Sequence, residues 1–266
     1  MVINPSTREK IENLIVKVID EIIQRKTIRE PFDMEEFTLK NPFHSALVPE
    51  EVWKIRNFER SFVTSFGMSI YQQIAKYIAE DKYGFAENGH RLVGKIYTGQ
   101  LTAIQNILDG LEHKRPDYKR SPNWNAEIKE VEQATKGEIV ERDVVLDLFA
   151  QSQKGETFYF EIKSSLPNSD QCKVSKEKML KIYAMKKDEN PHIYFALPDN
   201  PWIEKKKYNH PHALRWFNMR EDEVVIMGKD FWDLLGGKGT YEELIRIFES
   251  VGKTTKERIR KEFLKI

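Results

Sequence analysis

The feature that most constrains the fold of this chain is a predicted β-hairpin over residues 142–165. Residues 144–150 and 157–162 are rich in β-branched and aromatic side chains, as β-strands usually are. The polar segment 151–155 between them ends in Gly155, which can adopt the backbone angles that a chain reversal requires. The sequence therefore predicts two antiparallel strands joined by a short turn.

Three side chains on this hairpin have complementary chemistry. Because side chains alternate across a strand, Glu161 and Lys163 share one face, and the hairpin brings Asp147 close to them. Two carboxylates can hold Mg²⁺ while leaving most of its coordination shell to water and a phosphate oxygen. A lysine beside them can orient or help deprotonate a metal-bound water and can offset charge that develops on a phosphate. The set predicts metal-assisted phosphodiester hydrolysis, with Asp147, Glu161 and Lys163 as catalytic residues and the two acids as metal ligands.

Other acids compete for the metal-binding role. Asp143 has the same strand parity as Asp147 and is its main rival, and Glu138 is a weaker one. We favour Asp147 because it lies where the strand has become hydrophobic. A carboxylate at such a position is harder to explain as a structural residue than one at the polar start of the strand. Glu59, on a predicted helix, is a candidate accessory ligand. The alternative is that these acids are solvated charges on an exposed surface.

Predicted helices and strands surround the hairpin. The periodicity of apolar residues predicts helices over 6–26, over some thirty residues from Pro49, and over 100–111, 125–133 and 172–187. The first begins with a capping box at Ser6 and Glu9, and 27–44 is predicted to be a connecting loop. Strands are expected at 91–97 and 191–197. The order strand, strand, helix, strand indicates a mixed α/β core with one crossover.

Composition excludes several kinds of protein. The single cysteine, Cys172, allows neither an intrachain disulfide nor a zinc-binding thiolate cluster. No apolar run approaches the roughly 18–20 residues that span a bilayer, and the first residues lack the pattern of a signal peptide. We therefore expect a cytoplasmic protein that makes no membrane contact. The formal net charge of +1 hides a basic stretch from Asp170 to Arg215.

Two basic and aromatic segments are candidates for contacting DNA. One is the proline-bounded loop 113–125, and the other follows Trp202. Arginine, lysine and asparagine suit phosphates and base edges, and a run of three lysines suits phosphates best. An ordinary surface loop is the alternative for both. The candidate residues are Lys114, Arg115, Lys119 and Arg120 in the first segment and Lys205, Lys206, Lys207, Asn209 and His210 in the second.

The order of the hairpin with Asp147, the pair Glu161 and Lys163, and the segment 167–171 opening a helix resembles the PD-(D/E)xK nuclease superfamily. More narrowly, the chain resembles the TdeIII-like family of type II restriction endonucleases. The segments that add to this resemblance are Asn-Pro-Phe at 41–43, Pro-Glu-Glu at 49–51, Phe-Glu-Arg-Ser-Phe at 58–62, Asn-Pro-Trp at 200–202, Gly-Lys-Asp-Phe-Trp-Asp-Leu-Leu-Gly-Gly at 228–237 and Thr-Tyr-Glu-Glu-Leu at 240–244. The chain departs from the superfamily pattern in having Leu146, not proline, before Asp147.

The resemblance implies a fold and an activity. The fold would be a restriction-endonuclease-like α/β core, a mixed central sheet flanked by helices, with an α-helical N-terminal region. Residues 1–125 would form that region packed on the core and 126–266 the nuclease core with C-terminal helices, together one compact catalytic unit. The activity would be Mg²⁺-dependent cleavage of both strands of duplex DNA at a short palindromic site by a homodimer. Asn168 and Gln171 would join the DNA-contacting residues.

The resemblance also suggests a GC-rich interrupted site, GGNCC, and a cognate DNA methyltransferase that protects host DNA without direct contact. Two other readings stay open. One is a repair or junction nuclease that recognises DNA structure on the same core. The other is a non-catalytic DNA-binding protein.

Overall fold

The computed structural model describes residues 2–112 and 120–265, and these divide into two compact units. The helical unit comprises Ile3–Tyr71 and the chain from Glu242 onward, and the sheet unit comprises Gln72–Tyr241. The predicted boundary at residue 125 does not coincide with this division. The reason is that strands and a helix from residues 85–112 pair and pack with later strands of the sheet unit.

The helical unit is built on α1 (Pro5–Gln24), which continues as a π-helix, η1 (Arg25–Arg29). The other elements wholly within this unit are α2 (Met34–Lys40), α3 (Pro42–Ser45), α4 (Glu50–Ser65) and the π-helix η5 (Ile259–Leu264). It also includes the start of α5 (Met68–Tyr83) and most of α11 (Thr240–Arg258). The apolar stripe of α1 is buried, as its periodicity predicts.

Three local predictions for this unit are wrong. The cap of α1 is Asn4, whose side chain accepts a hydrogen bond from the Ser6 backbone N–H at 2.9 Å, so the predicted capping box does not form. The single long helix is two helices, interrupted between α4 and α5 at Phe66 and Gly67. The predicted loop 27–44 contains α2 and α3, which are too short to show an apolar period.

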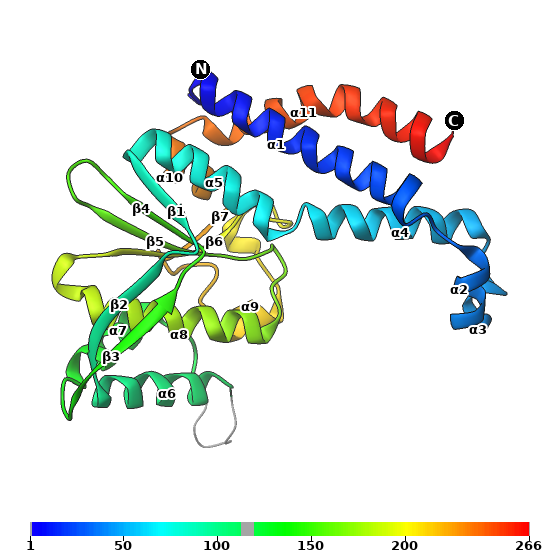
Figure 1. Cartoon of the computed structure of the whole chain (residues 1–266). Coiled ribbons are helices and arrows are strands. Elements are labelled where there is room, and N and C mark those ends of the chain that lie inside the picture. The colour runs from blue at the N-terminus through cyan, green and yellow to red at the C-terminus, as the bar shows by residue number, and fades with distance from the viewer. Residues whose placement is uncertain (1, 113–119, 266) are drawn as a thin grey trace. The chain divides into compact units, whose positions relative to one another are not determined.

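The sheet unit contains a five-stranded sheet of order β1-β4-β5-β6-β7 (Figure 1). Its strands are β1 (Phe85–Asn88), β4 (Leu148–Gln151), β5 (Thr157–Ile162), β6 (His192–Leu197) and β7 (Val225–Met227). The pairs β1–β4 and β4–β5 are antiparallel, and β5–β6 and β6–β7 are parallel. The predicted mixed α/β core is confirmed, with a second crossover between β6 and β7.

Helices flank this sheet (Figure 1). On one side lie α6 (Thr98–Glu112), α7 (Trp124–Gln133), α8 (Ser169–Lys186) and α9 (Pro211–Trp216), and on the other α10 (Lys229–Gly236) and the later part of α5. Short 3-10 turns, η3 (Lys187–Glu189) and η4 (Lys205–Lys207), follow α8 and β6. Buried apolar side chains of α6, α7, α8, α9 and the strands form the core. No helix among the described residues is long and apolar enough to cross a membrane.

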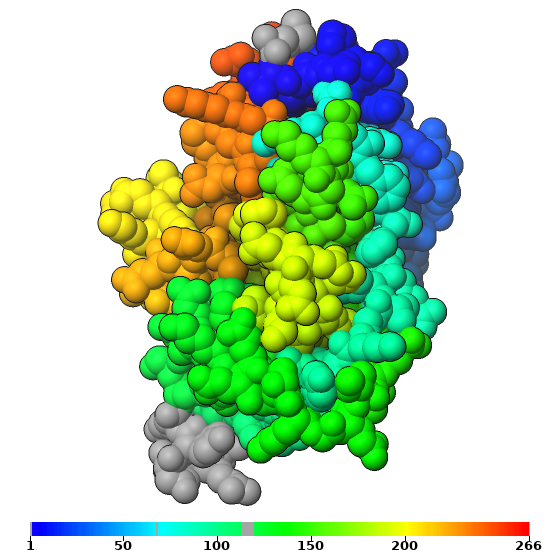
Figure 2. Space-filling model, turned by 90° about the vertical axis from the view of Figure 1, so that its left-hand side faces the viewer, coloured from blue at the N-terminus to red at the C-terminus, as the bar shows by residue number. Residues whose placement is uncertain are grey.

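The predicted hairpin is correct in its second half and wrong in its first. β4 and β5 pair as expected, but residues before Asp147 belong to β3 (Ile139–Val145), which pairs with β2 (Arg91–Tyr97) in a separate two-stranded ribbon. The chain passes between the two sheets at Leu146 and Asp147, whose backbone groups bond to His90 and Gly89. Figure 2 shows the β4–β5 turn, η3 and the ribbon following one another on the surface of the sheet unit.

Candidate active site

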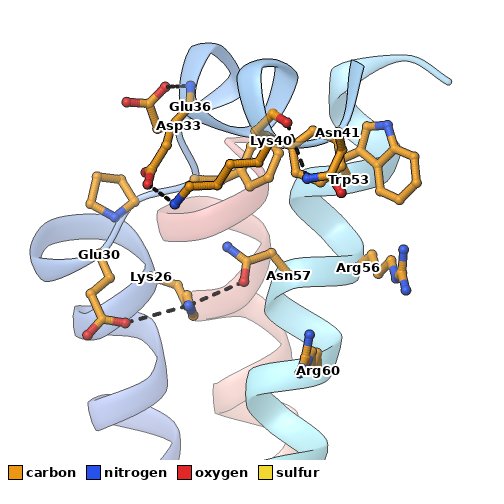
Figure 3. Close-up of a pocket in the computed structure, with 13 residues that line it drawn as sticks. Lys26, Glu30, Asp33, Glu36, Lys40, Asn41, Trp53, Arg56, Asn57 and Arg60 are labelled. Carbon is orange, nitrogen blue, oxygen red and sulfur yellow. Dashed lines mark hydrogen bonds and ion pairs between the residues drawn. The ribbon is translucent and has the colours of Figure 1, made fainter. Parts of the chain in front are cut away.

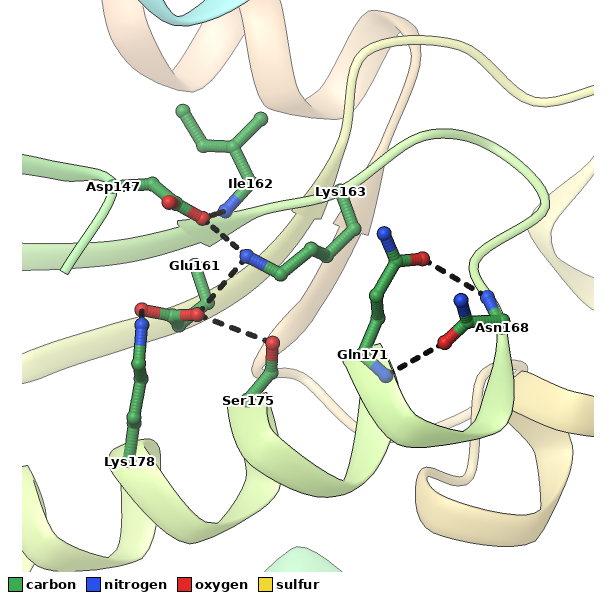
Figure 4. A network of polar contacts seen from close by, with 8 residues as sticks. All are labelled: Asp147, Glu161, Ile162, Lys163, Asn168, Gln171, Ser175 and Lys178. Carbon is green, nitrogen blue, oxygen red and sulfur yellow. Dashed lines mark hydrogen bonds and ion pairs between the residues drawn. The ribbon is translucent and has the colours of Figure 1, made fainter.

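The open end of the β4–β5 hairpin, away from its turn, carries Asp147, Glu161 and Lys163. Leu148 lies opposite Phe160 in the strand register, so Asp147, one residue earlier, and Glu161, one residue later, come together. The Lys163 Nζ lies 2.5 Å from Asp147 Oδ2 and 3.1 Å from Glu161 Oε2 (Figure 4). The Ile162 backbone N–H donates to the same Asp147 oxygen at 2.8 Å. The predicted triad therefore converges on one point.

Two side chains of helix α8 bond to the Glu161 carboxylate. Ser175 Oγ donates to Glu161 Oε2 at 3.1 Å, and Lys178 Nζ donates to Glu161 Oε1 at 3.0 Å (Figure 4). Glu161 is 1% exposed, whereas the Asp147 side chain is 20% exposed. Burial raises the pKa of Glu161, and Asp147 adds to this, although Lys163 and Lys178 act in the opposite direction. Glu161 is thus a buried acid whose charge depends on nearby cations.

Lys163 is the cation shared by both carboxylates. Burial alone would lower its pKa, but Glu161 and Asp147 raise the pKa of Lys163 above its ordinary value. The group is therefore a protonated donor and positive charge rather than a free amine. The neighbouring Cys172 is buried, and its pKa is raised to about 12 by that burial, so it is an inert thiol.

The donor set fits a hard divalent cation. Asp147 and Glu161 present oxygens to a single positively charged atom, and one of the two side chains reaches solvent. Mg²⁺ is usually held by one or two carboxylates and keeps several waters, so a two-carboxylate set is sufficient for it. Within residues 2–112 and 120–265 no group of three or more His, Cys, Asp or Glu is arranged so that it could hold a metal ion.

The rival acids have other neighbours. Asp143 lies on the ribbon, where its carboxylate accepts from Arg91 Nε at 3.0 Å and is about half exposed. Glu138 precedes β3 and is exposed, with its backbone bonded to Thr98. Glu59 is an exposed residue of α4 in the helical unit. The structure brings Asp147 together with Glu161 and Lys163, and does not add Asp143 or Glu138.

Two predicted DNA-contacting residues form the cap of α8. The Asn168 side chain accepts from the Gln171 backbone N–H at 2.8 Å, and the Gln171 side chain accepts from the Asn168 backbone N–H at 3.0 Å (Figure 4). This reciprocal cap fixes the start of the helix that presents Ser175 and Lys178. Both capping residues are exposed beside the candidate site.

The second predicted DNA segment adjoins the loop that follows Lys163. Tyr208 Oη donates to the Ser165 carbonyl at 2.9 Å, and a His210 ring nitrogen lies 2.9 Å from the Pro167 carbonyl oxygen. The Asn209 side chain accepts from Arg220. The structure therefore places this segment and the α8 cap together at the end of the sheet where the triad lies.

The three lysines of this segment are not equivalent. Lys205 Nζ donates to the carbonyls of Asp222 at 2.8 Å and Val225 at 2.6 Å, so it ties the segment to β7. Lys207 pairs with Glu204 at 2.6 Å, and Lys206 is exposed. In the first segment, Arg120 pairs with Glu130 at 3.0 Å. Lys114, Arg115 and Lys119 lie outside the described residues.

Sequence reasoning missed Ser175 and Lys178. Their signal was present, because Gln171, Ser175 and Lys178 recur at spacings of four and three residues and so share one face of a helix. It also missed Lys176, which lies in the basic stretch but is fully buried against Glu127 of α7. Not every positive charge of that basic stretch therefore lies on the surface.

Comparisons with known proteins show which family this chain resembles over most of its length. The family model described as "Type II restriction endonuclease, HinfI" matches residues 7–252. Among similar proteins from Herpetosiphon aurantiacus, the type II restriction enzyme HgiCII is 27% identical over 278 residues, covering 99% of this chain and 100% of the relative. The type II restriction enzymes HgiEI and HgiBI are each 27% identical over 282 residues with the same coverage.

Proposed function

Because the chain belongs to the HinfI family of type II restriction endonucleases, we propose that it cleaves both strands of duplex DNA at a short palindromic site, using Mg²⁺ held by Asp147 and Glu161. The observation that carries the proposal is the convergence of these two carboxylates on Lys163 at the open end of the hairpin. The same arrangement supports a place in the PD-(D/E)xK superfamily, and the motifs in the sequence support kinship with TdeIII-like enzymes.

Each residue has a separate task in this proposal. A bound Mg²⁺ would supply Lewis acidity to the scissile phosphate and a more acidic water. Asp147, the more exposed acid, forms the solvent side of the site, and Glu161 forms its buried side. Lys163, whose ammonium contacts both carboxylates, would orient the attacking water or donate to a phosphate oxygen as negative charge develops there.

Ser175 and Lys178 act as positioning residues. They hold both oxygens of Glu161 in place from α8, and Lys178 keeps a positive charge beside this buried carboxylate. Their bonds to Glu161 are separate from the bond that Lys163 makes, so α8 orients this carboxylate independently of the catalytic lysine. The cap formed by Asn168 and Gln171 fixes the helix from which they extend.

The finer features of the proposal concern recognition and assembly. Each chain supplies one Asp147–Glu161–Lys163 set, and a two-fold DNA site is matched most simply by a homodimer that presents one such set to each strand. The resemblance to TdeIII-like enzymes supports a GC-rich interrupted site such as GGNCC, a cognate methyltransferase and a cytoplasmic location. Lys206 and Asn209, beside the triad, are candidates for DNA contacts.

Digestion of a plasmid of mixed sequence tests the activity. With Mg²⁺ we expect discrete fragments whose ends map to one short sequence, and with EDTA we expect none. Nicking that follows DNA structure would instead indicate a junction or repair nuclease. Binding without cleavage at any divalent metal would indicate a non-catalytic DNA-binding protein.

A pair of variants tests the first acid. Asp147→Asn should abolish cleavage while leaving the fold intact, because it removes the charge of a part-exposed metal ligand. Asp143→Asn is the matched control, since it changes the same charge on the ribbon and loses only an exposed pair with Arg91. Cleavage that survives in Asp147→Asn but not in Asp143→Asn would move the metal to Asp143.

A further inference from the structure

The helical unit has a pocket between α2 and α4 that the candidate active site does not use. Its volume is about 490 Å³ (Figure 3). Asn41 and Arg60, which line it, come from the Asn-Pro-Phe and Phe-Glu-Arg-Ser-Phe segments, and the sequence analysis gave neither of these two residues a role. The fold therefore brings two separate motifs to one cavity.

One wall of the pocket is aromatic and rigid. The Phe37 ring lies 4.8 Å from the Trp53 ring and 5.5 Å from the Phe32 ring, measured between centroids. Trp53 is the one buried residue of α4, at 9% exposed, and its indole N–H donates to the Val48 carbonyl at 3.2 Å.

The acids of the pocket already have local partners. The Asp33 side chain caps α2 by accepting from the Glu36 backbone N–H at 3.0 Å, and the Glu36 side chain pairs with Lys40. Glu30 lies 3.8 Å from Lys26 (Figure 3). Glu36 and Glu30 are thus each paired with a lysine of the pocket, and Asp33 is bonded to a backbone N–H.

Two arginines of the pocket have no such partner. Trp53, Arg56, Asn57 and Arg60 follow one another at helical spacing on one face of α4, and both arginines are exposed. Within the described part of the chain, neither guanidinium forms a salt bridge. The Arg56 guanidinium carbon lies 5.3 Å from the centroid of the Trp53 ring, a distance at which a cation is attracted to the ring face.

The side-chain amides of Asn41 and Asn57 add a hydrogen-bond acceptor and hydrogen-bond donors to the pocket. The Asn41 amide nitrogen donates to the Phe37 carbonyl at 3.2 Å, which leaves its oxygen as an acceptor. Asn57 Oδ1 accepts from Lys26 Nζ at 3.3 Å, which leaves its amide N–H groups as donors. The pocket thus combines two guanidiniums, an acceptor and a donor beside flat rings.

We propose that this pocket is a DNA-binding site, in which Arg56 and Arg60 donate to a pair of acceptor atoms on the duplex. The acceptors are either the O6 and N7 edge of guanine or two phosphate oxygens, both of which match the fork of a guanidinium. This inference rests on the proposed endonuclease function, because that function supplies duplex DNA as the ligand. It assigns recognition to the helical unit in addition to the segment beside the triad.

The test uses Arg56→Ala, Arg60→Ala and the double variant of the full chain. Arg246→Ala is the matched control, since it removes one positive charge from an exposed position of α11 in the same unit. Binding of a fluorescently labelled duplex is measured by anisotropy in EDTA at several salt concentrations, for a duplex with the mapped cleavage site and one without it. Circular dichroism melting checks that each variant is folded.

The two sources of acceptors give different results. If the arginines read guanine, the preference for the duplex with the site falls by roughly 5- to 150-fold for each lost bidentate contact. If they hold phosphates, both duplexes bind more weakly and the salt slope falls by about one for each arginine. Affinity, preference and salt slope equal to those of Arg246→Ala would overturn the proposal. Unchanged DNA binding with a changed oligomeric state would instead make this face a subunit contact.

Plasmid cleavage by the wild-type chain separates this inference from the function on which it rests. Cleavage at one sequence by the wild type, with unaltered DNA binding in the double variant, would overturn the pocket assignment alone. Absence of cleavage and of DNA binding in the wild type would overturn the endonuclease proposal itself.

Discussion

Replacement of the buried Lys176 should be among the most destabilising single changes in the sheet unit. Its Nζ lies 2.6 Å from Glu127 Oε2, and both side chains are fully buried between α8 and α7. The ammonium also lies 4.3 Å from the centroid of the Phe217 ring. Lys176→Met leaves the Glu127 carboxylate buried without its counter-ion, and breaking a buried pair in this way costs about 3–5 kcal/mol.

Urea denaturation of Lys176→Met, followed by circular dichroism, measures this cost. Lys181→Met is the matched control on the same helix, because its pair with Glu177 is partly exposed and should contribute at most about 1 kcal/mol. Glu127→Gln keeps an acceptor for the Asn123 backbone N–H, which donates to Glu127 Oε1 at 3.1 Å. The double variant should therefore be less destabilised than the sum of the two single changes.

Two results would refute this reasoning. The first is a loss in Lys176→Met no larger than the loss in Lys181→Met. The second is additivity of Lys176→Met and Glu127→Gln within about 0.5 kcal/mol, since sites that interact directly should not add.

Three further predictions concern stability and DNA affinity. Because the pKa of Glu161 is raised, chiefly by burial, its contribution to stability is present below its ordinary value of 4.5 and is lost as the pH rises through the raised value. Metal-free Glu161→Gln should therefore gain stability relative to wild type as the pH rises above 4.5, and a difference in unfolding free energy that stays constant with pH would contradict this. Lys205→Ala should lower the melting temperature, because it removes two hydrogen bonds to backbone carbonyls, whereas Lys206→Ala should lower only DNA affinity. Equal decreases in melting temperature for the two variants would show that Lys205 has no special structural role. Ile203 has a φ of 66° and a side chain 91% exposed, so Ile203→Asn should stabilise the chain by about 1 kcal/mol in thermal unfolding, and a loss would show that the isoleucine makes a needed contact.

Local pattern in the sequence was sufficient for several elements and for the central site. The β-branched and aromatic residues at 157–162 predict β5, and the apolar period of α1, α6 and α8 predicts those helices, because both signals are carried by consecutive residues. The grouping of Asp147, Glu161 and Lys163 also follows, since a tight turn between adjacent strands determines which residues lie opposite each other.

The pairing of strands that are distant in the sequence decided the features that local patterns did not predict. The sequence predicts one strand over 144–150, yet β3 pairs with β2 and β4 pairs with β1 and β5, so the chain changes sheets at Leu146 and Asp147. This change separates Asp143 from Asp147 although the two share strand parity. The choice of partner strand depends on contacts many residues away, which the sequence of one strand does not contain.

The sequence by itself determined the type and order of the main elements of the sheet unit and the chemistry of the triad. Only the tertiary structure decided which charges are available to a ligand. Lys176 and Lys205 are cations of one basic stretch, but Lys176 is buried against Glu127 and Lys205 is bound to backbone carbonyls, whereas Lys206 is exposed. The physical reason is that the role of a charge depends on its burial and its partners, and both are set by residues brought together from elsewhere in the chain.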